Sequence, residues 1–504
     1  MKKIVTLCTL LLAVSLSAVA EKSVYFLLHG LYSSSQGWNT LIDSDEFTKS
    51  GFTYGGNFYL KENFFDSDKF DLTTELHKSL DKLLQRDNQV FTVHFASGYQ
   101  NDFMQQAVQI AKVLDSFPET GYDYYFVGHS MGGLAARYYV VNNPNRQIKG
   151  LITIGTPHLG SYLGNINRKI TSLLGVLFGI GKRPDQFLTG ISKVWKKESE
   201  TVIPSLVPDS DELNELSSKA FPTGIRSISI FSALNTQQEI EDLHNNEKLV
   251  LQMLQVQRIK AFAELAPTDL QIAKLYNDLY YTDGIGSIAS QNLNNAIPNK
   301  YEIEAYHIPT RIYHDNEPRD FEHLVPAMSI IKQQLPSRNM NLFVYSSREK
   351  LVSGFNKIFI KPSAYKVNLV VDVEDKTKSA FSDCQLSDYD YCIFLVDDNE
   401  QLTEIRDKID STWVKPIMID FSINNNIEQF QAKDCLYIKI ANPEEGEIFL
   451  KFLSDMFCGK MYVKRDELDQ VKEQILRYYF FASNMTERIY VPDYWWGDNL
   501  RFFQ

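Results

Sequence analysis

A short apolar stretch in this chain runs directly into a glycine-rich turn and then into a helical pattern. Residues 124–127 read Tyr-Tyr-Phe-Val, residues 128–132 read Gly-His-Ser-Met-Gly, and the helical pattern starts at Leu134. This matches the G-x-S-x-G turn between a strand and a helix, which holds a serine at a strained tip. Its glycines allow the strand and the helix to approach closely. An ordinary glycine-rich loop is the alternative, and the flanking strand and helix favour a nucleophile at Ser130 over it.

The surrounding sequence alternates strand-like and helix-like segments. Near-continuous apolar runs at 23–28, 90–95 and 148–154 are typical of strands buried on both faces of a parallel sheet. Helical patterns at 102–117 and after Ser130 separate them. An α/β architecture with a mainly parallel sheet follows from this alternation.

Four segments then resemble one superfamily. They are Leu-His-Gly-Leu at 28–31, Gly-His-Ser-Met-Gly-Gly at 128–133, Ile-Gly-Thr-Pro-His-Leu-Gly-Ser at 154–161 and Thr-Asp-Gly-Ile at 282–285. In this order they resemble the α/β-hydrolases, and among them the secreted bacterial lipases and esterases. The resemblance covers about residues 22–336 and is thin between 161 and 280. It implies an α/β-hydrolase fold with a helical cap or lid insertion.

The resemblance also implies partners for the serine, in the chain order Ser, acid, His. Asp283 lies in an Asp-Gly turn and is the expected acid. Of the three histidines that follow, His323 is the first choice for the base, because a helix-like segment at 327–335 comes shortly after it. His314, in a polar loop, is the second choice. His307 lies in a strand-like stretch, where we expect a packing role.

An oxyanion hole is expected from backbone N-H groups. The first turn of the helix after Ser130 supplies that of Met131. The resemblance assigns the other to Leu31, after the early His-Gly. His29, His129 and His158 lie in motif loops and are expected to support them. The predicted chemistry is proton removal from Ser130 by the histidine, attack on an ester carbonyl and hydrolysis of the acyl-enzyme, with no metal and no cofactor.

Residues 161–280 are expected to form the cap. The apolar stretch at 170–181 is too short to span a membrane and fits either a mobile lid that contacts lipid or a buried cap helix. A strand is expected at 225–231, and a polar helical insertion at 237–279 then delays Asp283.

A second, smaller α/β module is expected after a boundary at 336–339. Apolar runs at 341–345, 366–372, 391–396, 416–421 and 436–440 alternate with helical patterns such as 400–409 and 445–457. Its role and its protein partner are open. The aromatic closing stretch at 489–503 fits packing on its own chain better than a surface for lipid, sugar or protein.

The first 20 residues have the basic start, apolar centre and small-residue end of a secretory signal peptide. A periplasmic or extracellular location is therefore expected. The formal charge of −12 argues against nucleic acid as a partner. Four cysteines in the last quarter fit either two disulfides or buried free thiols, namely Cys384, Cys392, Cys435 and Cys458.

The sequence thus predicts residues 21–336 as a hydrolase domain and 340–504 as a module of unknown role. The leading hypothesis is a secreted serine hydrolase that cleaves carboxylic esters, those of lipids first, with transient contact to a lipid surface. A thioesterase or amidase with the same triad is one alternative. A surface binding protein that uses the hydrolase domain as a scaffold is another.

Overall fold

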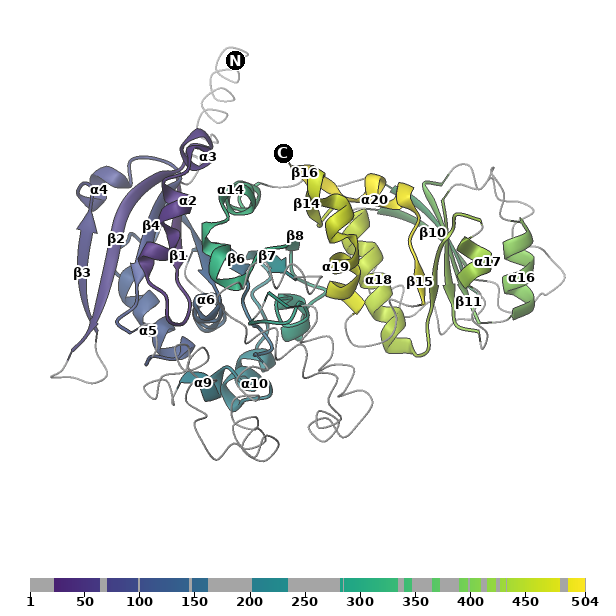
Figure 1. Ribbon diagram of the computed structural model, residues 1–504, viewed down its shortest axis with the longest axis horizontal. Coiled ribbons are helices and arrows are strands. Elements are labelled where there is room, and N and C mark those ends of the chain that lie inside the picture. Colours follow the sequence, from purple (N-terminus) through teal and green to yellow (C-terminus); the bar gives the residue numbers. More distant parts are fainter. Residues whose placement is uncertain are drawn as a thin grey trace, which may run out of the picture.

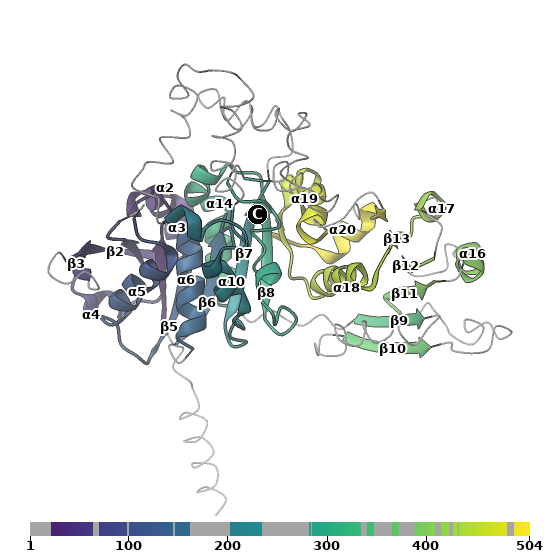
Figure 2. The ribbon, with the colours of Figure 1, turned by 90° about the horizontal axis from the view of Figure 1, so that it is seen from below.

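The computed structural model contains two large sheets, each covered by helices (Figures 1 and 2). It describes residues 22–63, 70–97, 100–144, 147–161, 202–233, 282–283, 285–333, 340–346, 365–371, 389–397, 399–408, 415–422, 427–431, 433–480 and 488–503. The expected signal peptide, the apolar stretch at 170–181, the insertion at 237–279 and the boundary at 336–339 lie outside these residues.

The first sheet has eight strands in the order β3-β2-β4-β1-β5-β6-β7-β8. Only the β2–β3 pair is antiparallel, and all the other neighbours are parallel. The strands are β1 (Lys22–Leu28), β2 (Thr53–Glu62), β3 (Phe70–Leu76), β4 (Gln89–His94), β5 (Tyr122–His129), β6 (Ile148–Ile154), β7 (Arg226–Ser232) and β8 (Ala305–Thr310). The mainly parallel sheet predicted from the sequence is confirmed, whereas the edge hairpin of β2 and β3 was not foreseen.

Helices cover both faces of this sheet. They are η1 (Ser35–Trp38), α2 (Asn39–Ile42), α3 (Asp45–Lys49), α4 (Leu80–Leu83), α5 (Phe103–Leu114), α6 (Met131–Asn142), α9 (Val202–Ser205), α10 (Asp211–Ser218), η5 (Leu293–Ala296), η6 (His314–Arg319) and α14 (Phe321–Ile330). Alternate residues of β1 point to opposite layers: Phe26 packs with α5 and α6, and Leu27 packs with α2, α3 and α14. Burial on both faces explains why these strands read as continuous apolar runs.

The second sheet has six strands in the order β10-β9-β11-β12-β13-β15. The strands are β9 (Met340–Ser346), β10 (Tyr365–Val371), β11 (Tyr391–Val396), β12 (Pro416–Asp420), β13 (Leu436–Lys439) and β15 (Ile489–Tyr490), with a separate pair of β14 (Tyr462–Lys464) and β16 (Arg501–Phe503). The helices are α16 (Asn399–Lys408), α17 (Ile427–Gln431), α18 (Pro443–Phe457), η8 (Arg465–Glu467), α19 (Leu468–Phe480) and α20 (Asp493–Asn499). A second α/β unit is therefore present.

The two units share an apolar core. Figures 1 and 2 show α18 and α19 between the two sheets. Phe231, at the end of β7, belongs to the core of the C-terminal unit and stacks on Tyr478 of α19 with ring centroids 3.8 Å apart. Next to it, the backbone N-H of His307 in β8 donates to the carbonyl of Lys460 at 2.9 Å. The C-terminal unit thus covers the β8 edge of the first sheet.

A buried charge cluster lies at this junction. The carboxylate of Asp455 has no exposed surface and contacts Lys451, Lys460 at 3.5 Å, the hydroxyl of Tyr479 at 3.0 Å and Nε2 of His307 at 3.6 Å. Burial alone raises the pKa of Asp455, but the two ammonium groups hold it well below its usual value. Burial lowers the pKa of Lys451 to about 8. Each charge therefore depends on the others for its solvation.

The cysteines are free thiols wherever the structure describes them. Cys392 and Cys435 are buried and Cys458 is partly buried, and none of the three forms a disulfide. Cys384 lies outside the described residues. Two disulfides would require all four cysteines, so that alternative is wrong, and the alternative of buried thiols holds for Cys392 and Cys435.

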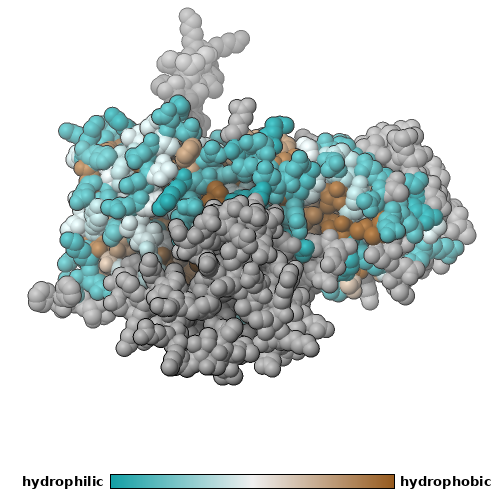
Figure 3. Space-filling view, in the orientation of Figure 1, coloured by the Kyte–Doolittle hydropathy of each residue, from teal (hydrophilic) through white to brown (hydrophobic). Residues whose placement is uncertain are grey.

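The aromatic closing stretch packs on its own chain, as the sequence favoured. Trp495 is fully buried and Trp496 nearly so, both in the core formed with α18 and α19. On the face shown in Figure 3 the described surface is mainly hydrophilic, and Val108 is the one large apolar side chain that is mostly exposed among the described residues. Among the described residues, no helix has the length and apolar character needed to cross a bilayer.

The charge cluster makes Asp455→Asn a test of how the two units are joined. Neutralising the carboxylate leaves the buried ammonium of Lys451 and the partly buried one of Lys460 without a counter-charge, so we expect the free energy of unfolding to fall by about 3–5 kcal/mol. Urea unfolding followed by tryptophan fluorescence measures this. Asp45→Asn, which removes the exposed Asp45–Lys49 pair, is the matched control and should have little effect. Equal effects of both substitutions would contradict the assignment.

Candidate active site

Ser130 occupies a strained turn between β5 and α6. Its backbone angles are φ 53° and ψ −128°, a conformation that a residue with a side chain rarely adopts. The turn is fixed by two hydrogen bonds: the N-H of Ser130 donates to the carbonyl of Ile154 at 3.0 Å, and that of Gly133 donates to the carbonyl of Ser130 at 3.0 Å. The strand, turn and helix predicted from the G-x-S-x-G motif are therefore present.

Glycines allow this turn to lie against its neighbours. A Cβ atom on Gly132 would lie 2.6 Å from the carbonyl oxygen of Leu28 and 2.5 Å from that of His29. A Cβ atom on Gly30 would lie 2.7 Å from the Cβ of Ser130. The loop after β1 and the start of α6 are in direct backbone contact for this reason, and Ser130 lies beside Gly30.

His29 holds the loop that carries Leu31. The N-H of Phe95 donates to Nε2 of His29 at 3.2 Å, so the ring proton is on Nδ1, which donates to the carbonyl of Gly30 at 2.9 Å. Burial lowers the pKa of His29 to about 4, which keeps the ring neutral. The N-H of Ser33 donates to the same carbonyl at 3.3 Å. In a trans peptide the N-H of Leu31 points opposite to this carbonyl, so its direction is fixed.

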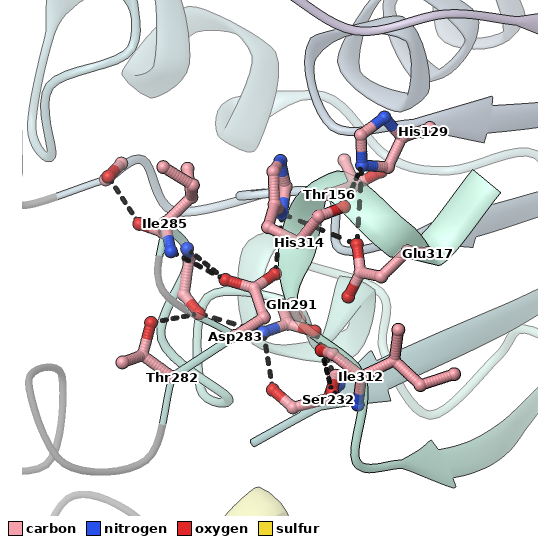
Figure 4. A network of polar contacts seen from close by, with 12 residues as sticks. His129, Thr156, Ser232, Thr282, Asp283, Ile285, Gln291, Ile312, His314 and Glu317 are labelled. Atoms are coloured by element: carbon pink, nitrogen blue, oxygen red, sulfur yellow. Dashed lines mark hydrogen bonds and ion pairs between the residues drawn. The ribbon is translucent and has the colours of Figure 1, made fainter. Parts of the chain in front are cut away.

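Asp283 and His314 form a buried pair (Figure 4). Nδ1 of His314 lies 2.7 Å from Oδ2 of Asp283, and both side chains are buried. The other carboxylate oxygen, Oδ1, accepts from the N-H groups of Ile285 at 2.8 Å and Gly286 at 2.7 Å. These bonds fix the carboxylate, and the neutral imidazole donates to it through Nδ1. Its unprotonated Nε2 points away from Asp283 and is free to act as a base.

This pair lies against the turn that carries Ser130. His129, the residue before the serine, donates from Nε2 to the backbone carbonyl of His314 at 3.0 Å, and the two rings are 4.6 Å apart. Burial and the nearby His314 lower the pKa of His129 well below its usual value, so it is neutral. His129 is thus a structural link between the serine turn and the histidine, in line with the support role expected for it.

The charge of Asp283 sets the protonation of His314. Burial lowers the pKa of this histidine, but the negative charge and the hydrogen bond of Asp283 outweigh burial, and the pKa is raised above its ordinary value of 6.5. A histidine held in this way is a stronger base than one in water.

Ser232 and Gln291 align the loops of this pair. Gln291 donates through Nε2 to the carbonyls of Gly286 at 2.8 Å and Ser232 at 2.9 Å. The Ser232 hydroxyl donates to the carbonyl of Ile312 at 2.6 Å and accepts from the N-H of the same residue at 2.7 Å. The end of β7 therefore ties the Asp283 loop to the His314 loop. Sequence reasoning missed both residues because their bonds join distant segments.

The structure corrects the choice of His323 as the partner of Asp283. His323 lies inside α14 and not in a loop before the last helix, with Nδ1 2.8 Å from Oδ2 of Asp320 and Nε2 3.3 Å from Oε2 of Glu467. Two carboxylates outweigh burial and raise its pKa to about 9, so it is charged near neutral pH. It joins α14 to the C-terminal unit. His314, the second choice, takes the place beside Asp283.

Two further histidines considered in the sequence analysis, His307 and His158, make structural contacts. His307 lies in β8, as expected, and its Nδ1 bonds the hydroxyl of Tyr478 at 2.9 Å. His158 is fully buried, and its Nε2 lies 3.3 Å from the hydroxyl of Thr153. Its backbone carbonyl accepts from the buried guanidinium of Arg137.

A carboxyl that the sequence analysis did not single out lies beside the pair. Oε2 of Glu317 is 3.4 Å from Nδ1 of His314 and 3.4 Å from Nε2 of His129, and its side chain has no exposed surface. Gly155, with φ 55°, leaves space for the Glu317 side chain, since a Cβ atom at position 155 would overlap with Oε2 of Glu317. Ligand atoms of His129, His314 and Glu317 all lie within 4.8 Å of one another, so these are the described residues that could hold a metal ion.

A family model described as palmitoyl protein thioesterase matches residues 61–189, about a quarter of the chain. The matched segment contains the serine turn. A comparison with curated proteins gives no match.

Solved structures with similar folds include three hydrolases. Bacillus licheniformis lipase BlEst2 in mature form is 10% identical, with 62% of this chain and 93% of that chain covered and a TM-score of 0.35. A metagenomic carboxyl esterase is 13% identical, with 63% and 77% covered and a TM-score of 0.32. Phospholipase PlaB from Legionella pneumophila is 13% identical, with 54% and 46% covered and a TM-score of 0.31.

Similarities this distant say nothing about substrate. The sheet, the serine turn and its contacts nevertheless confirm the resemblance to the α/β-hydrolases seen in the sequence. Together with the family match, they support a hydrolase of the lipase, esterase or thioesterase type.

The position of His323 predicts a pH-dependent stability. Its folded pKa of about 9 lies above the ordinary 6.5, so its stabilisation is complete below pH 6.5 and is lost as the pH rises through 9. We expect His323→Gln to cost on the order of 2–3 kcal/mol of unfolding free energy at pH 6.5 and almost nothing at about pH 10. Thermal unfolding across this range measures it. The exposed His77→Gln is the control, and a difference from wild type that stays constant with pH would contradict the prediction.

Proposed function

We propose that this chain, whose N-terminal unit has the α/β-hydrolase fold, is a serine hydrolase with Ser130 as nucleophile, His314 as base and Asp283 as the acid that orients it. The observation that carries the proposal is the 2.7 Å contact between Asp283 and His314, placed against the serine turn through His129. A serine alone is a poor nucleophile near neutral pH and needs such a pair beside it.

In the proposed reaction, Nε2 of His314 removes the proton of Ser130 as its oxygen attacks an acyl carbonyl. Asp283 keeps the proton on Nδ1 and stabilises the imidazolium that forms. The N-H of Met131 at the start of α6 and the N-H of Leu31 stabilise the tetrahedral oxyanion. His314 then protonates the leaving group, and a water molecule activated by the same nitrogen releases the acid from Ser130.

The proposed substrate is a carboxylic ester, and an ester of a lipid acyl chain is the first candidate. An acyl thioester is the second candidate, because the family model that matches residues 61–189 is described as palmitoyl protein thioesterase. Both substrates pass through the same acyl-enzyme, so the leaving group alone distinguishes them. Export through residues 1–20 to the periplasm or the medium is part of this proposal.

The triad is tested with purified wild type, Ser130→Ala, His314→Ala and His323→Gln. A fluorophosphonate probe should label Ser130 equally in wild type and in His323→Gln. It should label neither Ser130→Ala nor His314→Ala. Hydrolysis of p-nitrophenyl esters should fall at least about 10³-fold in Ser130→Ala and His314→Ala, since the members of a triad act as a unit. If His314→Ala kept the wild-type rate and His323→Gln lost it, the assignment of the base would be wrong.

The two leaving groups are compared with matched palmitoyl and butyryl substrates, once as oxygen esters and once as thioesters. Preference for the long-chain oxygen esters supports the lipase-type reading. A higher kcat/KM for the thioester of the same acyl chain would favour the thioesterase reading. Absence of labelling in wild type, with and without detergent, would contradict both.

A further inference from the structure

Glu317 is a fully buried carboxyl that the proposed reaction does not use. It is on η6, three residues after His314, and its Oε2 lies 3.4 Å from Nδ1 of His314 and 3.4 Å from Nε2 of His129. Neither of its oxygens has a hydrogen-bond donor among the described residues. An ionised carboxylate without a donor is one of the most costly groups to bury.

The two N-H groups beside Glu317 are already used by better acceptors. Nδ1 of His314 donates to Asp283 at 2.7 Å, and Nε2 of His129 donates to a backbone carbonyl at 3.0 Å. Both distances are well below 3.4 Å. Glu317 therefore gains little from either histidine.

The charged groups that face Glu317 are mostly acidic. Asp283 directly follows Thr282. Asp315 lies on η6, the same helix as Glu317, and Asp320 directly follows that helix. His129, from the end of β5, is neutral, and Gly155 after β6 offers only backbone. His314 can become positive there, but its charge is matched by Asp283. Burial first, and then Asp283, raise the pKa of Glu317 well above its usual value.

We propose that Glu317 is a neutral carboxylic acid in the resting protein and donates its proton in an O-H···O hydrogen bond to the carboxylate of Asp283. Two carboxylates cannot bond to each other, but a carboxylic acid and a carboxylate can, and the two carboxyls share a neighbour: Nδ1 of His314 lies 2.7 Å from Oδ2 of Asp283 and 3.4 Å from Oε2 of Glu317. The pair then carries one negative charge, which faces His314. Oδ2 of Asp283 accepts from His314 and has a second lone pair for this bond.

The consequence concerns the base of the proposed reaction. A proton shared with Glu317 draws negative charge away from Asp283, so Asp283 stabilises the imidazolium less strongly. Glu317 thereby limits how far the pKa of His314 is raised, and it keeps more of the histidine in the unprotonated form that accepts the serine proton. Glu317 is a positioning residue in this scheme. Only its link to catalysis rests on the proposed function.

A divalent metal ion is the competing occupant, because His129, His314 and Glu317 are close enough to share one. A metal bound through the two nitrogens nearest to Glu317, Nδ1 of His314 and Nε2 of His129, would need the lone pairs of atoms that now donate hydrogen bonds to Asp283 and to the His314 carbonyl. Binding would break both bonds, so the arrangement favours the proton over the metal.

The experiment measures the pKa of His314 by NMR of histidine-labelled resting protein, in wild type, Glu317→Gln and Glu317→Leu. Gln is neutral and keeps a donor toward Asp283, so its His314 pKa should stay within about 0.3 of wild type. Leu removes the donor, and the pKa should rise by about 0.5–1. If Glu317 is ionised, Gln removes a negative charge beside the imidazole, and a fall of about 1 or more would overturn the proposal.

Infrared spectra of glutamate-labelled protein near pH 7 give a second readout that still decides the matter if Glu317→Leu does not fold. The C=O band of a protonated carboxylic acid should be present in wild type, absent in Glu317→Gln and unchanged in Glu302→Gln, an exposed control. Its absence from wild type would overturn the proposal, as would tight zinc binding to wild type that Glu317→Gln abolishes. Neither readout needs substrate, so a failure here is separate from a failure of the ester assay.

Discussion

The strained turn at Ser130 is the constraint on which the site depends. Its positive φ places the serine above the sheet, and it can exist only because Gly132 lies against the carbonyls of Leu28 and His29. The strain of such a turn is offset by the packing around it. The same contact brings Gly30 beside the serine, so one close approach of backbones sets both the proposed nucleophile and the proposed oxyanion donors.

The histidine is held more indirectly. It lies 31 residues after Asp283 in sequence, and Ser232 and Gln291 align the two loops through backbone hydrogen bonds. On either side of it, His307 and His323 are bound to the C-terminal unit. Those two contacts therefore hold the segment that carries His314 at both of its ends. The C-terminal unit, whose core includes Phe231, is therefore part of what positions the proposed base.

Buried carboxyls at the site and at the junction have opposite protonation for a physical reason. Asp455 faces two ammonium groups, which keep it ionised in the interior. Glu317 faces acidic neighbours and a histidine whose charge is already matched, which favours its neutral form. Burial is common to both, so the sign of the surrounding charge decides the state of each group.

The sequence by itself determined the local elements. The apolar runs predicted the ends of β1, β4, β5, β6 and β7 to within two residues, and the glycine pattern identified the Ser130 turn, because strands buried on both faces and close backbone contacts restrict which residues can occupy neighbouring positions. It ranked His323 ahead of His314 as the partner of Asp283, whereas in the fold His314 pairs with Asp283 and His323 pairs with Asp320. Only the tertiary structure decided which histidine pairs with Asp283, because side chains far apart in sequence are brought together by the packing of whole strands and helices and not by any local pattern.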